Sequence, residues 1–315
     1  MQILQAPRAS AILYNLIKSR FDTRPWLLPA NICPIVPITF LKANVSFDLV
    51  DISAQTLHMD LEQAEAQIRT RRFGGLLYAH TYGEASTPND FFHQIKSEDE
   101  SILIVDDRCL CIPEVQPDAE NLADVQLYST GYAKILDLGL GGFAFLSEGV
   151  PYRSAHLPFD PLAQDRIEGQ YKQAIRDATA FTYEDGNWLQ TDAVLPAWEE
   201  YRRQIEDGLT FSMSHRSKLN RIYASRIPQE LQLPDAYQNW RFNIRVGNNA
   251  QMVKAIFEAG LFASSYYASL AGIMVEGRCP QAEALHNAVI NLFNDHHFDE
   301  AKAERACEVI LENLH

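Results

Sequence analysis

The 315-residue sequence has no apolar run close to the roughly 20 residues that a membrane-spanning helix needs, so we expect a soluble protein. It is also poor in basic residues: 27 lysines and arginines stand against 41 acidic residues, for a formal net charge of -14. Nucleic acids and anionic membranes repel a surface of that sign. We therefore expect neither of them as a partner.

Cysteines are few as well. The five are Cys33, Cys109, Cys111, Cys279 and Cys307. An odd number without a Cys-x-x-Cys pair, and without a recognisable secretory signal, argues against a disulfide framework and predicts the reducing cytoplasm. The pair Cys109-Leu-Cys111 has no two further ligands close by in the sequence, so we expect no metal and interpret these residues as ordinary semi-buried thiols.

What the first 150 residues do contain is an alternation of short apolar strands with helices. The expected strands cover residues 26–28, 45–50, 75–79, 102–105, a segment from 126, and 142–146; the expected helices cover 35–43, 61–71, 91–96 and a first helix with Ser10 as its N-cap. Alternation at these lengths predicts a mostly parallel sheet covered on both faces, with ligand sites at the carboxyl ends of the strands.

The pattern changes after residue 150. Long, charged helices are expected over residues 164–180 and 195–225, followed by a strand at 240–246, a helix at 250–259 and a terminal helix at 300–314. We therefore predict an α/β protein with a large domain over residues 1–150, followed over residues 151–315 by linking helices and a smaller α+β domain.

Two positions in the first domain indicate chemistry. Lys134 lies in a polar turn after a strand and before a Gly-rich turn, and the apolar strand Ser101-Ile-Leu-Ile-Val ends abruptly in Asp106-Asp107. A carboxylate at the end of a buried strand is costly unless it has a cationic partner. Pyridoxal 5'-phosphate (PLP) requires a lysine amine for its aldehyde, a carboxylate for its ring nitrogen, and donors for its phosphate. Lys134 and Asp107 together therefore predict PLP chemistry.

Seven short motifs along the chain support this reading. They are Pro29-Ala-Asn-Ile-Cys-Pro, Val50-Asp-Ile, His80-Thr-Tyr-Gly, Ile104-Val-Asp-Asp107, Ser129-x4-Lys134, Gly139-x-Gly-Gly142 and Cys279-Pro-x-Ala-Glu283. In this order they resemble the DegT/DnrJ/StrS-type PLP-dependent sugar aminotransferases over nearly the whole chain. The resemblance implies the fold type I aminotransferase architecture, a homodimer with active sites at the subunit interface, and transfer of an amino group from glutamate to a keto sugar nucleotide.

The resemblance also implies roles for single residues. Lys134 matches the Schiff-base lysine, which as a free amine also moves a proton. Asp107 matches the aspartate that keeps the pyridinium nitrogen protonated. We interpret the neighbouring Asp106 as a strand-end cap that bonds backbone amides. Ser129 matches a hydroxyl that binds the phosphate.

Three further cofactor contacts are implied. Ala9 and Ser10 correspond to the phosphate-binding turn at a helix N-terminus, where the family has a glycine and this chain has Arg8, which can add charge. A plain N-cap is the alternative for Ser10. Asn187, in Gly186-Asn187-Trp188, corresponds to an asparagine that a neighbouring subunit supplies to the phosphate, and an ordinary turn residue is its alternative.

The chain departs from the family pattern at two cofactor positions. Leu110 stands where a Gln or His contacts the phenolic oxygen, and it cannot donate a hydrogen bond. Cys33 stands where an aromatic side chain stacks on the ring, and it offers a small polarisable surface. In the pair Tyr266-Tyr267, which resembles a His-Tyr of the substrate region, we interpret the tyrosines as core packing. His80 is interpreted as structural and not as a base.

The leading hypothesis is a PLP-dependent aminotransferase that takes small-molecule substrates. Another PLP reaction, such as dehydration or racemisation, stays open, although a lysine at position 134 favours transamination. A degenerate member that binds a ligand or regulates is also open, because of Leu110, Cys33 and the missing glycine. A nicotinamide enzyme is disfavoured because Gly139-Leu-Gly-Gly precedes a strand and does not open a helix.

Overall fold

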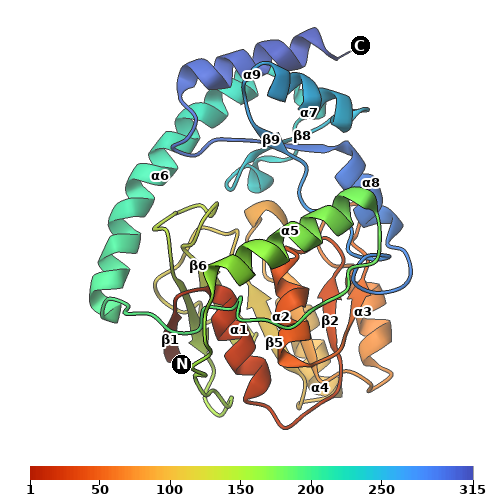
Figure 1. The fold of residues 1–315 in the computed structure, drawn as a ribbon, viewed down its shortest axis with the longest axis vertical. Coiled ribbons are helices and arrows are strands. Elements are labelled where there is room, and N and C mark those ends of the chain that lie inside the picture. Colours follow the sequence, from red (N-terminus) through yellow and green to blue (C-terminus); the bar gives the residue numbers. More distant parts are fainter. Residues whose placement is uncertain (315) are drawn as a thin grey trace.

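The computed structural model describes residues 1–314, which form two sheets joined by a long helix. The seven-stranded sheet lies in the N-terminal half, the three-stranded sheet lies near the C-terminus, and α6 (Trp198–Arg226) runs along one side from the first to the second (Figure 1). No helix within residues 1–314 combines the length and the apolarity needed to cross a membrane.

The large sheet has the strand order β1-β7-β6-β5-β4-β2-β3. Its strands are β1 (Gln2–Ala6), β2 (Trp26–Pro29), β3 (Phe47–Val50), β4 (Gly75–Ala79), β5 (Leu103–Asp107), β6 (Val125–Ser129) and β7 (Gly142–Leu146). Strands β2 to β6 pair in parallel, whereas β7 is antiparallel to both β6 and β1. The expected mostly parallel sheet is confirmed, and β1 was not expected.

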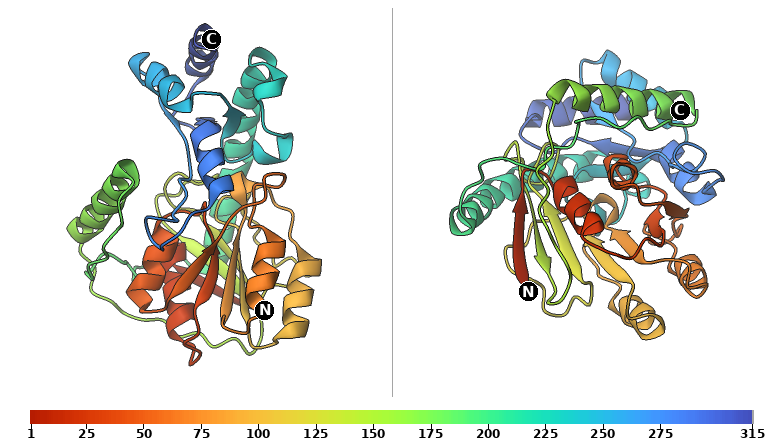
Figure 2. Two further views of the ribbon diagram at one scale, coloured as in Figure 1. Left: turned by 90° about the vertical axis from the view of Figure 1, so that its right-hand side faces the viewer. Right: turned by 60° about the horizontal axis from the view of Figure 1, so that its bottom comes forward.

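Helices cover both faces of this sheet. α1 (Ala9–Lys18) and α2 (Ile35–Ala43) lie on one side, and α3 (Leu61–Ile68) and α4 (Asn89–Glu98) on the other (Figure 2). Successive residues of β4 divide between the two cores: Leu77 packs with α1 and α2, and Leu76 packs with α3 and α4. Burial on both faces explains why these strands are continuous apolar runs instead of alternating ones.

The start of α1 differs from the expectation. The helix begins at Ala9 with Arg8 as its N-cap, so the interpretation of Ser10 as the N-cap is wrong. The reason is a tertiary contact: a Cβ atom on Gly142 would lie 2.3 Å from the Ala9 amide nitrogen. Because Gly142 has no side chain, the chain at Arg8 and Ala9 can approach β7 closely and turn into the helix there.

The smaller sheet is antiparallel, with the order β8-β10-β9. It consists of β8 (Phe242–Arg245), β9 (Ala263–Ser264) and β10 (Val289–Leu292), and it packs with α7 (Asn249–Glu258), α9 (Glu300–Glu312) and the C-terminal half of α6. Between the two sheets in sequence lie α5 (Pro161–Asp177) and two short 3-10 turns, η2 (Gln229–Leu231) and η3 (Asp235–Tyr237).

One helix of the second half was missed in the sequence. α8 (Pro280–Ala288) begins directly after Cys279, and the carboxylate of Asp51 accepts hydrogen bonds from the backbone amides of Gln281 and Ala282, both at 2.9 Å. Asp51 lies just after β3, so the large domain caps this helix from a distance in sequence. Two of the seven motifs, Val50-Asp-Ile and Cys279-Pro-x-Ala-Glu283, meet at this contact.

Candidate functional site

Three of the predicted site residues, Asp107, Ser129 and Lys134, lie at the carboxyl edge of the large sheet. Asp107 is the last residue of β5 and Ser129 the last residue of β6, and the two strands are parallel neighbours with Asp107 opposite Leu127. Lys134 lies in the loop that follows β6 and is half-buried. The parallel pairing of β5 and β6 therefore brings Asp107 to the same edge of the sheet as Ser129 and Lys134, which lie further along the chain.

The pKa shifts of two thiols, Cys33 and Cys109, indicate that Lys134 and Asp107 share one environment. Burial raises the pKa of Cys33, and burial together with Asp107 raises the pKa of Cys109 well above its usual value. At both thiols the charge of Lys134 acts in the opposite direction and lowers the pKa, while the charge of Asp107 raises it. The amine and the carboxylate thus lie within electrostatic reach of the same two side chains.

The Asp107 carboxylate is buried and only partly satisfied. Its Oδ1 accepts a hydrogen bond from the Cys109 amide at 3.0 Å. Among residues 1–314 it forms no ion pair, because Arg108 turns to Asp106 instead. A buried carboxylate without a cation is costly, so this position suits a cationic ligand atom.

Asp106 points to the opposite side of the strand and belongs to a different network. Its carboxylate contacts His80 Nε2 at 2.6 Å and accepts from Asn121 Nδ2 at 2.6 Å and Arg108 Nη1 at 3.2 Å. The expectation that Asp106 bonds backbone amides is wrong, because successive strand residues face opposite sides and this side presents side-chain donors. Burial alone would raise the pKa of Asp106, but His80, Arg108 and Asn121 together hold it below its usual value.

This network predicts a pH-dependent stability. A carboxylate with a lowered native pKa stabilises the fold fully above its ordinary pKa of about 4 and loses that contribution as the pH falls through the native pKa. We expect Asp106→Asn to lower the free energy of unfolding by about 3 kcal/mol at pH 7 and to remove part of the acid sensitivity. Urea unfolding at pH 7 and pH 3 measures both effects. Asp90→Asn, on the surface of α4, is the control, and equal stability of wild type and Asp106→Asn would contradict the prediction.

His80 links the same network to His58 and Glu84. The second ring nitrogen of His80, Nδ1, contacts the Glu84 carbonyl at 2.7 Å, and His58 Nε2 lies 3.6 Å from a Glu84 carboxylate oxygen. Burial lowers the pKa of His58 to about 3, so this imidazole is neutral at pH 7. Because both nitrogens of His80 already have partners, we interpret the group as a structural polar network.

Three of the predicted phosphate residues, Ala9, Ser10 and Ser129, lie next to one another. Ser129 pairs with Gly142 in the β6–β7 ladder, and Gly142 abuts Ala9. The first intrahelical bond of α1 runs from the Ala11 amide to Arg8 O at 3.1 Å, so the amides of Ala9 and Ser10 precede it and face the open helix end. A hydroxyl, two amides and a helix N-terminus thus form one cradle.

Arg8 does not simply replace the missing glycine at this cradle. Its Nη2 donates to Gln164 Oε1 of α5 at 2.8 Å. Burial lowers the pKa of Arg8 and the charge of Glu168, also on α5, opposes that shift. The Arg8 guanidinium therefore binds α5, although Arg8 itself is the N-cap of α1.

Cys33 lies just before α2 and faces residues that were not predicted to be near it. Cys33 and Tyr267 lie close enough that each affects the pKa of the other, and the charge state of Cys33 also affects the pKa of Tyr171 on α5. Tyr266 and Tyr267 stack with ring centroids 5.1 Å apart. The core-packing interpretation is wrong for Tyr266, which is 48% exposed.

The path of the chain from Tyr266 to Leu270 explains where the two tyrosines lie. The Leu270 amide donates to the Ala30 carbonyl at 2.9 Å, so the chain leaves the small sheet and attaches to the end of β2 beside Cys33. The resemblance of Tyr266-Tyr267 to a substrate-region motif was the signal in the sequence. Their aromatic composition alone indicated burial.

Asn187 stands apart from the other predicted residues. Asn187 is exposed on a turn whose neighbour Gly186 accepts a hydrogen bond from Lys42, near the C-terminal end of α2, whereas Cys33 precedes the N-terminal end of that helix. The structure of one chain therefore does not bring Asn187 to Lys134. Leu110 is buried in an apolar cluster with Tyr82 and Trp240.

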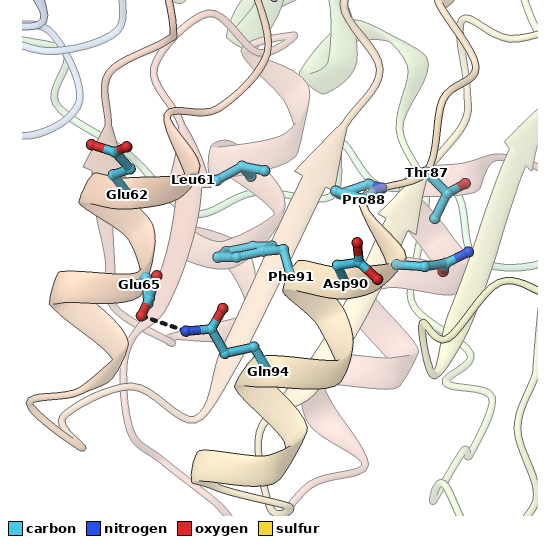
Figure 3. A pocket seen from close by; sticks show the side chains of 9 residues that line it. Leu61, Glu62, Glu65, Thr87, Pro88, Asp90, Phe91 and Gln94 are labelled. Atoms are coloured by element: carbon cyan, nitrogen blue, oxygen red, sulfur yellow. Dashed lines mark hydrogen bonds between the residues drawn. The ribbon is translucent and has the colours of Figure 1, made fainter.

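An open groove lies elsewhere on the molecule, between α3 and α4 (Figure 3). Its walls carry the acidic residues Glu62, Glu65 and Asp90 around Phe91. It contains none of the residues around Lys134, and the residues that line it include no lysine, arginine or histidine. We do not interpret it as the active site.

Comparison with solved structures identifies the architecture. A scan of protein-family models found no match to the sequence, and neither did a search of curated proteins. A DegT DnrJ EryC1 StrS aminotransferase from Brucella abortus is 15% identical, with a TM-score of 0.68 over 100% of this chain and 86% of that one. DesV from S. venezuelae, in complex with a ketimine intermediate, is 16% identical, with a TM-score of 0.69 over 98% and 84%.

A third similar structure is a Streptococcus pneumoniae protein assigned as a sugar aminotransferase, in its PLP form. It is 15% identical, with a TM-score of 0.71 over 97% of this chain and 85% of that one. These likenesses run over both sheets and the helices between them. The chain therefore has the fold type I architecture of PLP-dependent aminotransferases, as the sequence predicted.

Proposed function

We propose that the protein is a PLP-dependent aminotransferase that moves an amino group from an amino donor, glutamate, to a keto substrate, a nucleotide-linked keto sugar. One observation carries the proposal: the buried Asp107 carboxylate has no cationic partner among residues 1–314 and shares its surroundings with the Lys134 amine. A pyridinium nitrogen would supply the missing cation. The likeness in fold to aminotransferase structures supports the same reading.

The residues present suit the cofactor at its other end as well. Ser129, the Ala9 amide and the Ser10 amide and hydroxyl would hold the phosphate, since an anion at a helix N-terminus is stabilised by unpaired N–H groups and by the helix dipole. Gly142 leaves the room that brings Ala9 close to β7. PLP, when bound, would act as the electron sink for the bond changes at the amino donor.

The side chains around the ring would have distinct tasks. Lys134 would bond the aldehyde and, as a free amine, would carry the proton between substrate and cofactor. Asp107 would keep the ring nitrogen protonated by favouring its cationic form. Burial raises the pKa of Cys33, so this residue stays a thiol, a weak nucleophile, and does not compete with Lys134 for the aldehyde.

We also propose a homodimer in which the partner subunit's Asn187 reaches the phosphate. The support is its exposure on a turn that is anchored through Lys42 and Asp185 instead of lying at the site of its own chain. Size-exclusion chromatography with light scattering tests the dimer. A monomer at all concentrations would rule out this arrangement.

The proposed activity is tested by a half-reaction without an acceptor. Protein loaded with PLP is expected to absorb visible light, and added glutamate is expected to remove that absorbance and release one 2-oxoglutarate per bound PLP. Loss of absorbance without 2-oxoglutarate would favour another PLP reaction or another donor. A chain that binds no PLP would overturn the proposal.

A further inference from the structure

Three consecutive carbonyl oxygens around Lys134 are held from outside the large sheet. Trp240 Nε1 donates to Ala133 O at 2.7 Å. Arg216 Nη2 donates to Lys134 O at 3.0 Å and to Ile135 O at 3.1 Å. We call Arg216 and Trp240 the carbonyl clamp, because together they bind every carbonyl from residue 133 to residue 135.

Arg216 reaches this loop from the middle of α6 and is only 1% exposed. Its other donor, Nη1, bonds the Trp240 carbonyl at 2.7 Å and the Asn294 side chain, both next to the small sheet. Burial, together with the charge of Arg241, lowers the pKa of Arg216 to about 10, so it remains a cation at pH 7. Most of the oxygens that accept hydrogen bonds from the Arg216 guanidinium are carbonyl and amide oxygens. Some of these belong to the Lys134 loop and the others to residues next to the small sheet.

The geometry requires an arginine. The planar guanidinium presents donors in a fixed fork, so one side chain can bind the loop on one edge and the small-sheet side on another. A lysine places its donors on a single nitrogen and cannot cover both sets of oxygens. The Nε–H of Arg216 adds a bond to the Ser212 hydroxyl at 3.2 Å, and that hydroxyl in turn donates to Ile135 O.

The loop has a conformation that needs such support. Ala133, directly before Lys134, has a φ of 60°, in the left-handed region that is unfavourable for a residue with a Cβ atom. Its neighbour Tyr132 is 80% exposed and provides little packing. Conformations of this kind persist when the surroundings impose them.

We infer that Arg216 and Trp240 are positioning residues for Lys134. Their contacts in this loop are to the backbone carbonyls of residues 133–135. By holding that backbone they set the direction in which the Lys134 side chain projects from the loop. The role of the amine itself rests on the proposed function. The carbonyl clamp concerns the conformation of the loop that carries this amine. That conformation can be measured without PLP, and its effect on the amine can be measured with PLP.

Hydrogen exchange of the cofactor-free chain tests the clamp directly. In Arg216→Lys we expect the amides of residues 131–137 to exchange about tenfold faster than in wild type, as the loss of one to two hydrogen bonds predicts. Amides of β8 and β10 are expected to keep their rates. Tyr223→Phe is the matched control, because it removes another buried hydrogen bond of α6, from the Tyr223 hydroxyl to Phe293 O, without touching the loop.

Covalent trapping gives the second readout. At one subsaturating PLP concentration, borohydride reduction and peptide mapping are expected to find about tenfold less PLP fixed on Lys134 in Arg216→Lys than in wild type or Tyr223→Phe. If Arg216→Lys does not fold, Trp240→Phe carries both tests with a smaller change in the same direction, since it removes the single bond to Ala133 O.

The two hypotheses fail in different ways. Loop exchange that is unchanged in the clamp variants, or equally fast in Tyr223→Phe, would overturn the inference. Exchange that rises throughout α6 and the small sheet would also overturn it, because that result describes a general loss of stability. Wild-type protein that binds no PLP on Lys134 would overturn the proposed function, and the exchange rates would still decide whether the clamp holds the loop.

Discussion

Lys134→Ala is expected to lower the rate of transamination on the order of 10⁴-fold or more. The substitution removes the amine that bonds the aldehyde and the group that carries the proton, and proton transfer by a positioned side chain alone accounts for a factor of about 10²–10⁴. The half-reaction with glutamate measures the rate. Borohydride reduction followed by peptide mapping shows whether PLP is still bound covalently.

The control for this variant is Lys254→Ala. Lys254 lies on α7, is exposed, and forms an ion pair with Glu258 at 3.7 Å, so its removal changes the same net charge away from the predicted site. Thermal unfolding of both variants shows that the chain still folds. Transamination at more than about a tenth of the wild-type rate in Lys134→Ala would assign the chemistry to another residue.

Asp107→Asn is expected to lower the same rate on the order of 10²–10³-fold while PLP still attaches to Lys134. The amide has nearly the same shape as the carboxylate but no charge, so the ring nitrogen loses the group that favours its protonated form. Half-reaction rates and the covalent PLP content measure the two effects separately. This separation distinguishes the ring contact from a general loss of binding.

Asp107→Glu provides the matched comparison, because it keeps the charge and lengthens the side chain. We expect it to retain more activity than Asp107→Asn. The buried neighbour Asp106 offers a contrasting case, since Asp106→Asn is expected to reduce stability and to leave the covalent attachment of PLP intact. Equal rates for Asp107→Asn and wild type would show that this carboxylate does not serve the ring.

The large sheet could be predicted because its strands carry their own signal. Gly75–Ala79 and Gly142–Leu146 are short apolar runs bounded by polar turns, and the structure places β4 and β7 within those bounds. α2 likewise covers residues 35–43 as expected, with Pro37 tolerated in its first turn. In these segments local pattern and tertiary burial agree, so pattern alone was sufficient.

Other elements depend on contacts with distant segments. β1 is recognisable only as the antiparallel partner of β7, and the N-terminus of α8 is completed by the carboxylate of Asp51. The start of α1 is set by the bare backbone of Gly142, and the orientation of Tyr267 by the attachment of Leu270 to Ala30. A local window of sequence does not contain these partners.

The sequence by itself determined the alternation of strands and helices. It also determined the placement of Asp107 and Ser129 at strand ends and the presence of Lys134 in the following turn. These features follow from short-range periodicity and from the order of the motifs. Only the tertiary structure decided that Asp106 and Asp107 face different networks, that Tyr267 meets Cys33, and that Arg216 holds the Lys134 loop. The reason is physical: side-chain pairing and burial depend on which segments the sheet order brings together, and that order is a property of the whole chain.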